Sequence, residues 1–152
     1  MLLSEYGFVR RLGIWLCLLP IVLRFRSLPK LLKCQRLVLR RVQSKSPAEM
    51  DRAVRMTIRL CHLRVFRLPR FPRACLRQSM TLYRVLNRMG YPVQSHFGIH
   101  KDGDVLQGHS WVTLEGRPIA ERTQTEAFKL VYSCPRIPIP DLDCRRLVAL
   151  RS

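Results

Sequence analysis

The sequence predicts an α+β fold, with helices in the first part of the chain and a small antiparallel sheet after them. Apolar residues recur every three or four positions between residues 47 and 89, which is the period of a helix. From Val93 onward they alternate with polar residues, which is the period of a strand. With 152 residues, 47% of them hydrophobic, the chain can bury one core. We predict an apolar and basic helical segment over residues 1–46 and the core over residues 47–152.

Positive charge is concentrated in the first part of the chain. Residues 1–90 hold 20 of the 28 Lys and Arg residues and three acidic residues, a balance of +17, whereas residues 91–152 have a balance of +1. Such a surface attracts an acidic partner, a nucleic acid or an anionic membrane. For any single arginine, the solvated face of a helix is an equally good interpretation.

An apolar run of 12 residues, Leu12–Leu23, lies between two basic clusters near the N-terminus. It is shorter than the roughly 20 apolar residues that span a bilayer, and no small-x-small cleavage site follows it. We therefore expect a helix, interrupted at Pro20, that packs on the core or on a partner. Peripheral membrane contact through residues 8–26 is the alternative.

Two further helices are expected before the central one. Residues 30–41 have the pattern of a short amphipathic helix. Ser46 then precedes Pro47 and Glu49, the arrangement of an N-cap, a proline at the first helical position and a capping box. The helix that starts there is predicted to run from Pro47 to about Leu63. His62, near its end, is expected to interact with the helix dipole rather than to bind a ligand.

The central helix is predicted to start just after Pro72 and to end at Gly90, a residue that suits the left-handed position after a helix. Cys75 lies in its first turn, on an inward stripe with Ser79 and Leu82. Three arginines fall on the opposite side: Arg77, Arg84 and Arg88. Backbone N–H groups and the positive end of the helix dipole favour a thiolate at such a place. A buried cysteine that acts as a small apolar residue is the alternative.

Three strands are expected after this helix. The first covers residues 93–100, the second runs from about Gln107 to Leu114, and the third holds Ile119 and Glu121. Residues 125–133 are expected to form a short helix that covers the sheet.

The hairpin between the second and third strands decides whether His109 can meet Glu121. A three-residue loop, residues 114–116, would pair Thr113 with Arg117 and place His109 directly opposite Glu121. The Cβ atoms of such a pair lie about 4.5 to 5.5 Å apart. A two-residue loop would place the two side chains on opposite faces, because a shift of one residue inverts the alternation. Both loops are open on the sequence alone, and the chemistry below assumes the first.

With that pairing, Cys75, His109 and Glu121 form a candidate catalytic triad. The sulfur is the nucleophile, the imidazole takes its proton, and the carboxylate fixes the tautomer of the imidazole. His96 and His100 are alternative bases, but neither has an acid at a comparable spacing. The six cysteines include no C-x-x-C pair, which argues against a metal site and against a small disulfide framework and favours a location in the reducing cytoplasm. We also expect no cofactor.

Three runs of this sequence resemble one family: CLRQSMTLYRVLNRMG at residues 75–90, GHSWV at residues 108–112 and GRPIAE at residues 116–121. They are similar to the transglutaminase-like, or papain-like, cysteine peptidases of lasso-peptide biosynthesis, over roughly residues 47–130. The resemblance implies Cys75, His109 and Glu121 as the triad, with the cysteine at a helix N-terminus. The implied activity is removal of the leader peptide from a ribosomally synthesised precursor. That family usually has aspartate at the position of Glu121.

Some members of that family carry a separate leader-recognition domain of roughly 80 residues ahead of the catalytic core, whereas 46 residues precede Pro47 here. The resemblance therefore implies the stand-alone B-type protein. Such a protein works with a separate leader-recognition protein, which presents the precursor peptide, and with an ATP-using macrolactam synthetase.

Two other functions are consistent with parts of the pattern. A transglutaminase-type enzyme would form the same thioester and transfer the acyl group to an amine. A non-enzymatic nucleic-acid-binding module would explain the positive charge but not the order of cysteine, histidine and acid. The chain also does not interleave aromatic with basic residues as base-stacking proteins do. We therefore expect no nucleic-acid partner.

Overall fold

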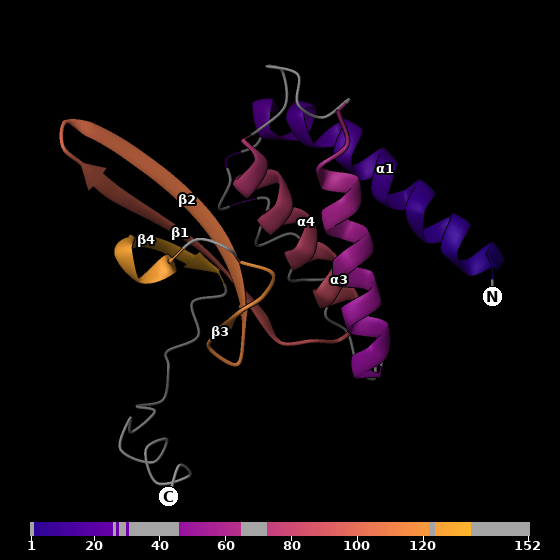
Figure 1. Ribbon diagram of the computed structural model, residues 1–152. Helices are drawn as coiled ribbons and strands as arrows, with labels where there is room; N and C mark the ends of the chain where they lie inside the picture. The colour runs from indigo at the N-terminus through magenta and orange to yellow at the C-terminus, as the bar shows by residue number, and fades with distance from the viewer. Residues whose placement is uncertain are drawn as a thin grey trace, which may run out of the picture.

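The computed structural model describes residues 2–25, 27, 30, 46–64, 73–121 and 124–134. Within these residues, the helices α1 (Leu2–Phe25), α3 (Pro47–Cys61) and α4 (Ala74–Arg88) precede a four-stranded antiparallel sheet (Figure 1). Its strands are β1 (Val93–Asp102), β2 (Val105–Leu114), β3 (Arg117–Pro118) and β4 (Lys129–Cys134), in the spatial order β3-β2-β1-β4. The predicted α+β architecture, with helices packed on a small antiparallel sheet, is confirmed.

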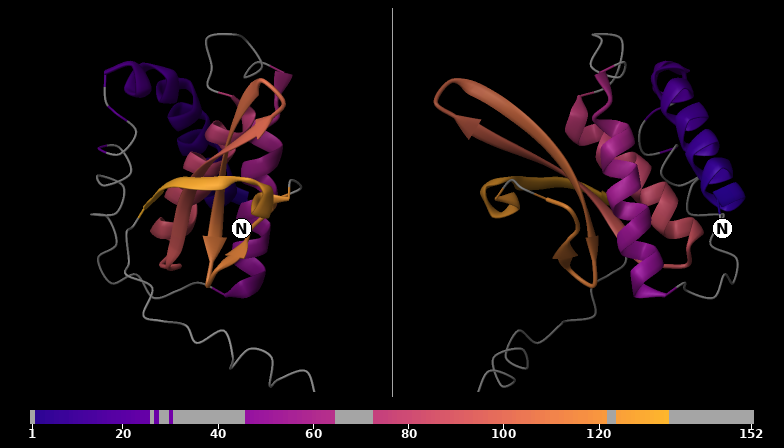
Figure 2. Two further views of the ribbon diagram at one scale, coloured as in Figure 1. Left: turned by 90° about the vertical axis from the view of Figure 1, so that its left-hand side faces the viewer. Right: turned by 45° about the vertical axis from the view of Figure 1, so that its right-hand side comes forward.

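Helix α4 lies in the middle of the molecule. It packs on β1 and β2 with one side and on α3 and α1 with the other, and Figure 2 shows it between the sheet and α1. Nine of its residues are buried, from Arg77 to Asn87. A helix covered on both sides has no solvated face over most of its length, so the single inward stripe that we predicted is too narrow.

Arg77 shows the consequence most clearly. It is only 3% exposed, and its Nε–H donates a hydrogen bond to the carbonyl oxygen of Cys61 at 3.0 Å. Because Cys61 is the last residue of α3, the guanidinium satisfies a free carbonyl at the negative end of that helix. The prediction that Arg77 faces solvent is therefore wrong. Arg84 covers the ring of Trp15 in α1, and Arg88 is exposed.

Helix α3 begins as the sequence predicts. Ser46 is its N-cap, the Ser46 side chain accepts from the backbone N–H of Glu49, and the Glu49 carboxylate accepts from the backbone N–H of Ser46. Its buried face is formed by Ala53, Val54, Thr57 and Cys61. Helix α3 therefore packs firmly on α4 and ends next to the first turn of that helix.

Helix α1 is one uninterrupted helix of 24 residues, with Pro20 inside it. Leu12 and Leu16 pack before the proline, and Leu19 packs with Met80 of α4 next to it. This packing holds the helix together despite the hydrogen bond that a proline removes, so the predicted interruption is wrong. One helix among the described residues, over Tyr6–Phe25, is long and apolar enough to cross a membrane. The apolar segment is thus longer than the 12-residue run suggested.

The end of α4 and the start of the sheet follow the prediction. Gly90 has a φ of +88°, and the N–H groups of Gly90 and Tyr91 donate to the carbonyls of Asn87 and Leu86. These two hydrogen bonds form the Schellman motif that a glycine permits after a helix. The helix expected over residues 30–41 lies, apart from Lys30, outside the described residues, and so does Pro72.

The last part of the sheet differs from the prediction. Residues 125–133 were expected to be helical, but a short 3₁₀ turn, Thr125–Ala127, leads into β4, which pairs with β1. Apolar, β-branched and aromatic residues in β4 suit a strand, and β1 offers it an edge. Gly98 in β1 makes room for the turn, because a Cβ there would lie 2.8 Å from the Cβ of Phe128.

Candidate active site

Cys75 is the second residue of α4. Arg73 is the N-cap and provides no side-chain hydrogen bond to the helix, so the backbone N–H groups of the first turn have no side-chain cap. The Cys75 side chain is half-buried and lines a cavity. Free N–H donors and the positive helix end stabilise negative charge on a thiolate or on an oxyanion. The position that the sequence predicted for this thiol is therefore confirmed.

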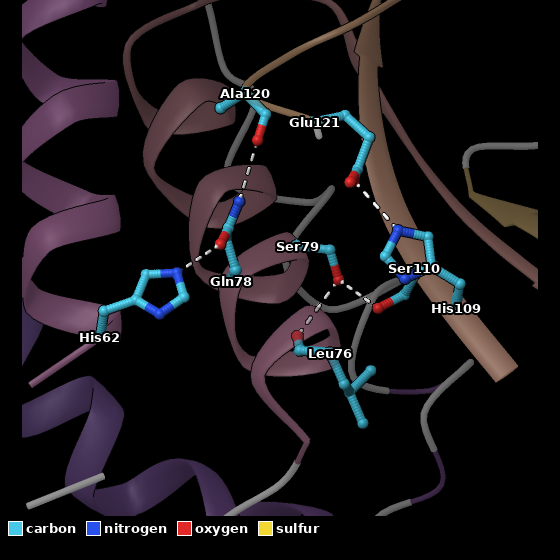
Figure 3. A network of polar contacts seen from close by, with 8 residues as sticks. All are labelled: His62, Leu76, Gln78, Ser79, His109, Ser110, Ala120 and Glu121. Atoms are coloured by element: carbon cyan, nitrogen blue, oxygen red, sulfur yellow. Dashed lines mark hydrogen bonds and ion pairs between the residues drawn. The ribbon is translucent and has the colours of Figure 1, made fainter. Parts of the chain in front are cut away.

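His109 is carried by β2, and a buried hydrogen bond fixes β2 against α4. The hydroxyl groups of Ser79 and Ser110 lie 2.9 Å apart, and Ser79 also donates to the carbonyl of Leu76 at 3.2 Å (Figure 3). Ser79 lies one turn after Cys75, and Ser110 is adjacent to His109. The bond between these two serines therefore sets the spacing between the strand of the imidazole and the helix of the thiol.

The hairpin that leads to Glu121 has a different register from the one we assumed. Thr113 pairs with Pro118 and Leu114 pairs with Arg117, which leaves a two-residue loop of Glu115 and Gly116. Both loop residues have positive φ, +51° and +78°, as a type I′ turn requires. The expected pairing of His109 opposite Glu121 is therefore wrong, and β3 ends before Ile119.

Glu121 nevertheless reaches His109, because the chain turns after β3. Ile119 still donates to the carbonyl of Val112 at 2.9 Å, but Ala120 then takes a left-handed conformation with φ +55°. This turn breaks the strand alternation and brings Glu121 Oε2 to 3.1 Å from His109 Nε2 (Figure 3). A left-handed alanine costs about 1–2 kcal/mol. Gln78 Nε2 donates to the Ala120 carbonyl at 3.2 Å and supports the turn.

The pair of His109 and Glu121 is shielded from solvent. Their side chains are 14% and 13% exposed, and the rings of Trp111 and Phe128 lie 6.0 and 5.2 Å from the imidazole. Glu121 lies off the Nε2–H direction, so this contact is an electrostatic pairing without an aligned hydrogen bond. Low polarity around the pair strengthens its electrostatic attraction. Since the carboxylate occupies the Nε2 side, Nδ1 is the ring nitrogen left for proton exchange with a thiol.

Cys75, His109 and Glu121 line a single cavity of about 540 Å³. Its other walls are mostly apolar and come from α3, α4, β2 and the segment after β3, with Ile58, Leu82, Trp111, Val112 and Ile119 among them. A concave, mainly apolar site with a few convergent polar groups is the usual form of a ligand or substrate site. All three side chains that the sequence predicted for the site are therefore brought together.

The other histidines have different places. His96 does not line this cavity; its Nε2 lies 2.8 Å from Thr113 Oγ1, and burial lowers its pKa. His100 also lies outside it, with Nδ1 donating to the carbonyl of Ala127 at 2.9 Å. His62 is the C-cap of α3, near the dipole as predicted, but it also lines the cavity and bonds to Gln78. His109 is thus the histidine with both the cavity position and an acid partner.

The described cysteines are all free, and they differ in accessibility. Cys61 and Cys134 are buried, and burial raises the pKa of the Cys61 thiol to about 11. Cys17 is exposed on α1. Cys75 alone among the described cysteines lines the cavity. This placement supports Cys75 as the nucleophile, because a buried thiol with a raised pKa is unreactive.

Sequence reasoning missed the supporting roles of the residues around the triad. Gln78, Ser79 and Ser110 tie α4 to β2 and to the Ala120 turn, and Gly98 admits Phe128 beside His109. Only Gln78 and Ser79 had a signal, since both follow Cys75 by one helical turn. The role of Gly98 depends on a segment 30 residues later and has no local pattern.

Comparison with known proteins adds one match to this geometry. A family model described as transglutaminase-like superfamily matches residues 15–133. The match runs from the middle of α1 into β4 and includes Cys75, His109 and Glu121. No match was found among curated proteins or solved structures.

Proposed function

This chain belongs to the transglutaminase-like superfamily, and we propose that it is a cysteine peptidase that removes the leader peptide from a ribosomally synthesised lasso-peptide precursor. The superfamily includes cysteine peptidases and acyltransferases, generally with a catalytic cysteine. One observation carries the proposal. The thiol of Cys75 lines the same cavity as a shielded pair of His109 and Glu121, whose atoms approach to 3.1 Å.

The proposed reaction proceeds through a thioester. His109 Nδ1 accepts the proton of Cys75, and the sulfur attacks the carbonyl carbon at the end of the leader. The C–N bond breaks, the imidazolium gives its proton to the leaving amine, and the core peptide departs with a free amino terminus. Water then attacks the thioester, losing a proton to the imidazole, and the leader is released as a carboxylate. Glu121 stabilises the imidazolium in both halves.

The backbone N–H of Cys75 supports the same step. It lies in the uncapped first turn of α4, where the peptide dipoles favour a negative ligand. In the proposed reaction it donates to the oxyanion of the tetrahedral intermediate.

The partners of this reaction belong to the proposal as well. A separate leader-recognition protein would present the precursor, and a macrolactam synthetase would use the new amino terminus, all in the cytoplasm. Exposed arginines of α3, Arg52 and Arg59, together with Arg55, which pairs with Asp51, form a basic surface suited to an acidic leader or recognition protein. If charge reversal at Arg52 and Arg59 together leaves both cleavage and partner affinity unchanged, this docking surface is wrong.

The proposal is tested by following the mass of a precursor peptide with time. Purified protein is incubated with the precursor and the recognition protein, and the wild type is compared with Cys75→Ala and His109→Ala. Cys17→Ser is the matched control, since that exposed thiol lies on the outer side of α1. We expect a free core peptide and a leader with a terminal carboxylate from the wild type and from Cys17→Ser only. Cleavage that survives Cys75→Ala would overturn the proposal.

The same experiment separates hydrolysis from acyl transfer. A transglutaminase-type reaction would leave the leader joined to an amine, with the corresponding mass, instead of a free carboxylate. Steeply salt-dependent binding of nucleic acid that is unaffected by Cys75→Ala, without any cleavage, would favour the non-enzymatic alternative.

A further inference from the structure

The position of Glu121 depends on one unusual backbone residue. Ala120, directly before it, is left-handed with φ +55°, and β3 has already ended. An L-residue with a Cβ rarely adopts this conformation, so the contacts around the turn have to hold it. Without the turn, the strand alternation would direct Glu121 away from His109. The geometry of the acid therefore depends on whatever holds Ala120.

Gln78 is the described side chain that holds this turn. Its Nε2 donates to the Ala120 carbonyl at 3.2 Å, and its Oε1 lies 3.1 Å from His62 Nε2 (Figure 3). Since the amide nitrogen faces a carbonyl, the amide oxygen faces His62, and the imidazole donates from Nε2. His62 is fixed in turn, because it is the C-cap of α3 with its backbone N–H bonded to Ile58. The chain of bonds thus runs from the end of α3 to the turn before Glu121.

We propose that Gln78 is a positioning residue, which holds Glu121 against His109 through the Ala120 turn, and that His62 orients its amide. The inference rests on the proposed function in one respect, since it assumes that the pair of His109 and Glu121 acts on Cys75. Gln78 lies one turn after Cys75 on the same helix, so one rigid element fixes both the nucleophile and the acid. Gln78 also lines the cavity, so variants in the Glu121→Gln background are needed to distinguish an effect through Glu121 from a direct contact with the substrate.

The test combines two measurements on the intact protein. The first is the rate at which iodoacetamide alkylates Cys75 at pH 6.5, located by peptide mass, which needs no knowledge of the substrate. The second is kcat and KM for precursor cleavage. We expect Gln78→Met to lower the alkylation rate and kcat about 10-fold with little change in KM, because a positioning residue acts on the chemical step. Gln107→Met, at an exposed glutamine of β2, is the matched control.

Two double variants separate positioning from a general structural role. In the Glu121→Gln background, Gln78→Met is expected to cause no further loss, because the residue through which it acts is already disabled. Ala120→Gly is expected to restore part of the loss in Gln78→Met, since glycine adopts the left-handed turn without support. An undiminished loss in the Glu121→Gln background would overturn the inference. If alkylation behaves as expected but no precursor is cleaved, the inference stands and the proposed function fails.

A second, independent inference concerns the outer face of α1. Its inner face is buried through Leu12, Leu16 and Leu19. The outer face exposes large apolar side chains at helical spacing: Ile14 (53%), Leu18 (45%), Ile21 (54%) and Phe25 (79%). Exposed arginines flank this stripe, Arg10 and Arg11 at one end and Arg24 at the other. An exposed apolar stripe with basic flanks matches the interface of an anionic bilayer, where apolar residues insert and arginines reach the headgroups.

We infer that this outer face of α1 docks on the surface of an anionic lipid bilayer. The helix lies along the surface instead of crossing it, because a crossing would withdraw Leu12, Leu16 and Leu19 from the core. The protein would therefore bind the membrane peripherally, through α1. The cavity is lined by other parts of the molecule, namely α3, α4, β2 and the segment after β3.

Vesicle sedimentation tests this inference. The protein is mixed with vesicles of phosphatidylcholine alone or with phosphatidylglycerol added. We expect sedimentation with the anionic vesicles only, weaker at high salt, and its loss in the variant Leu18→Asp/Ile21→Asp. The variant Val105→Asp/Leu106→Asp, at two exposed apolar residues near the β1–β2 turn, is the control. Equal sedimentation of both variants, or a lipid-free dimer that Leu18→Asp/Ile21→Asp dissociates, would overturn the inference.

Discussion

The C-terminal end of α3 and the N-terminal end of α4 lie side by side, and each carries a cysteine. Cys61 ends α3, is 1% exposed and has a pKa raised by burial to about 11. Cys75 is the second residue of α4, is half-buried and shares a cavity with His109 and Glu121. The negative end of a helix disfavours a thiolate and the positive end favours one. Place in the fold, and not residue type, therefore separates the buried thiol from the thiol that lines the cavity.

Replacing each thiol separately is the strongest test of the difference between Cys61 and Cys75. Cys75→Ala is expected to lower kcat/KM for precursor cleavage by at least about 10⁴-fold, as the loss of a nucleophile does in other triads. Cys61→Ala is expected to keep kcat/KM near the wild-type value and to lower the free energy of unfolding by about 1–2 kcal/mol, because it leaves a small cavity beside Leu16. Cleavage assays and urea unfolding measure the two effects. Equal losses of cleavage in both variants would contradict the comparison.

The second prediction removes the proposed base, His109, from the cavity that Cys75 lines. His109→Ala is expected to lower kcat by at least about 10³-fold, because both proton transfers of the thioester route lose their carrier. His100→Gln serves as the control, since His100 bonds to a backbone carbonyl outside the cavity. Pre-steady-state kinetics would show whether formation of the thioester is the step lost. A similar loss in His100→Gln would argue against His109 as the base.

The third prediction concerns the acid. Glu121→Gln keeps the shape of the side chain but removes the charge that stabilises the imidazolium. We expect kcat to fall by about 10²-fold, less than after loss of the nucleophile, because the orienting acid contributes less in a triad. The pH dependence of kcat/KM, measured for both proteins, checks the assignment. A profile and a rate identical to those of the wild type would leave the contact at 3.1 Å without a catalytic role.

The smallest expected effect is the pH dependence of stability at the Cys61 end. Burial raises the pKa of Cys61 from 9.0 to about 11, so the folded protein holds its proton more tightly than the unfolded chain does. This contribution to stability is complete below pH 9 and is lost as the pH rises to about 11. A shift of two pKa units sets an upper limit of about 2–3 kcal/mol on this contribution to the free energy of unfolding. The free energy of unfolding, measured in urea between pH 8 and pH 11, should therefore fall less steeply with pH in Cys61→Ala than in the wild type. Parallel curves for the two proteins would contradict the assignment.

Local patterns in the sequence predicted the helix ends and the site residues. The capping box at Ser46, the left-handed Gly90 and the cysteine in the first turn of α4 each follow from a few adjacent residues. These features have short-range causes, which a sequence displays directly. The division into residues 1–46 and 47–152 stays a prediction, although α1 packs on α3 and α4.

The errors arose where distant segments decide the local structure. Arg77 looked like a solvent-facing residue, but the carbonyl end of α3 covers it. The third strand was extended too far, because a left-handed alanine has no pattern of its own and is held by a glutamine 42 residues away. The correct meeting of His109 and Glu121 was thus predicted from an incorrect register. Residue types indicated the chemistry, while tertiary contacts determined how the chain achieves it.

Alkylation of the native protein by iodoacetamide at pH 6.5, with each modified cysteine located by mass, tests the central claim most directly. Exposed Cys17 provides an internal reference for a thiol outside the cavity, and buried Cys61 provides one for a protected thiol. We predict that Cys75 reacts fastest, that Cys61 stays unmodified, and that His109→Ala slows Cys75 at least about 10-fold while Cys17 keeps its rate. A Cys75 rate that equals that of Cys17 and is unchanged by His109→Ala would contradict the account.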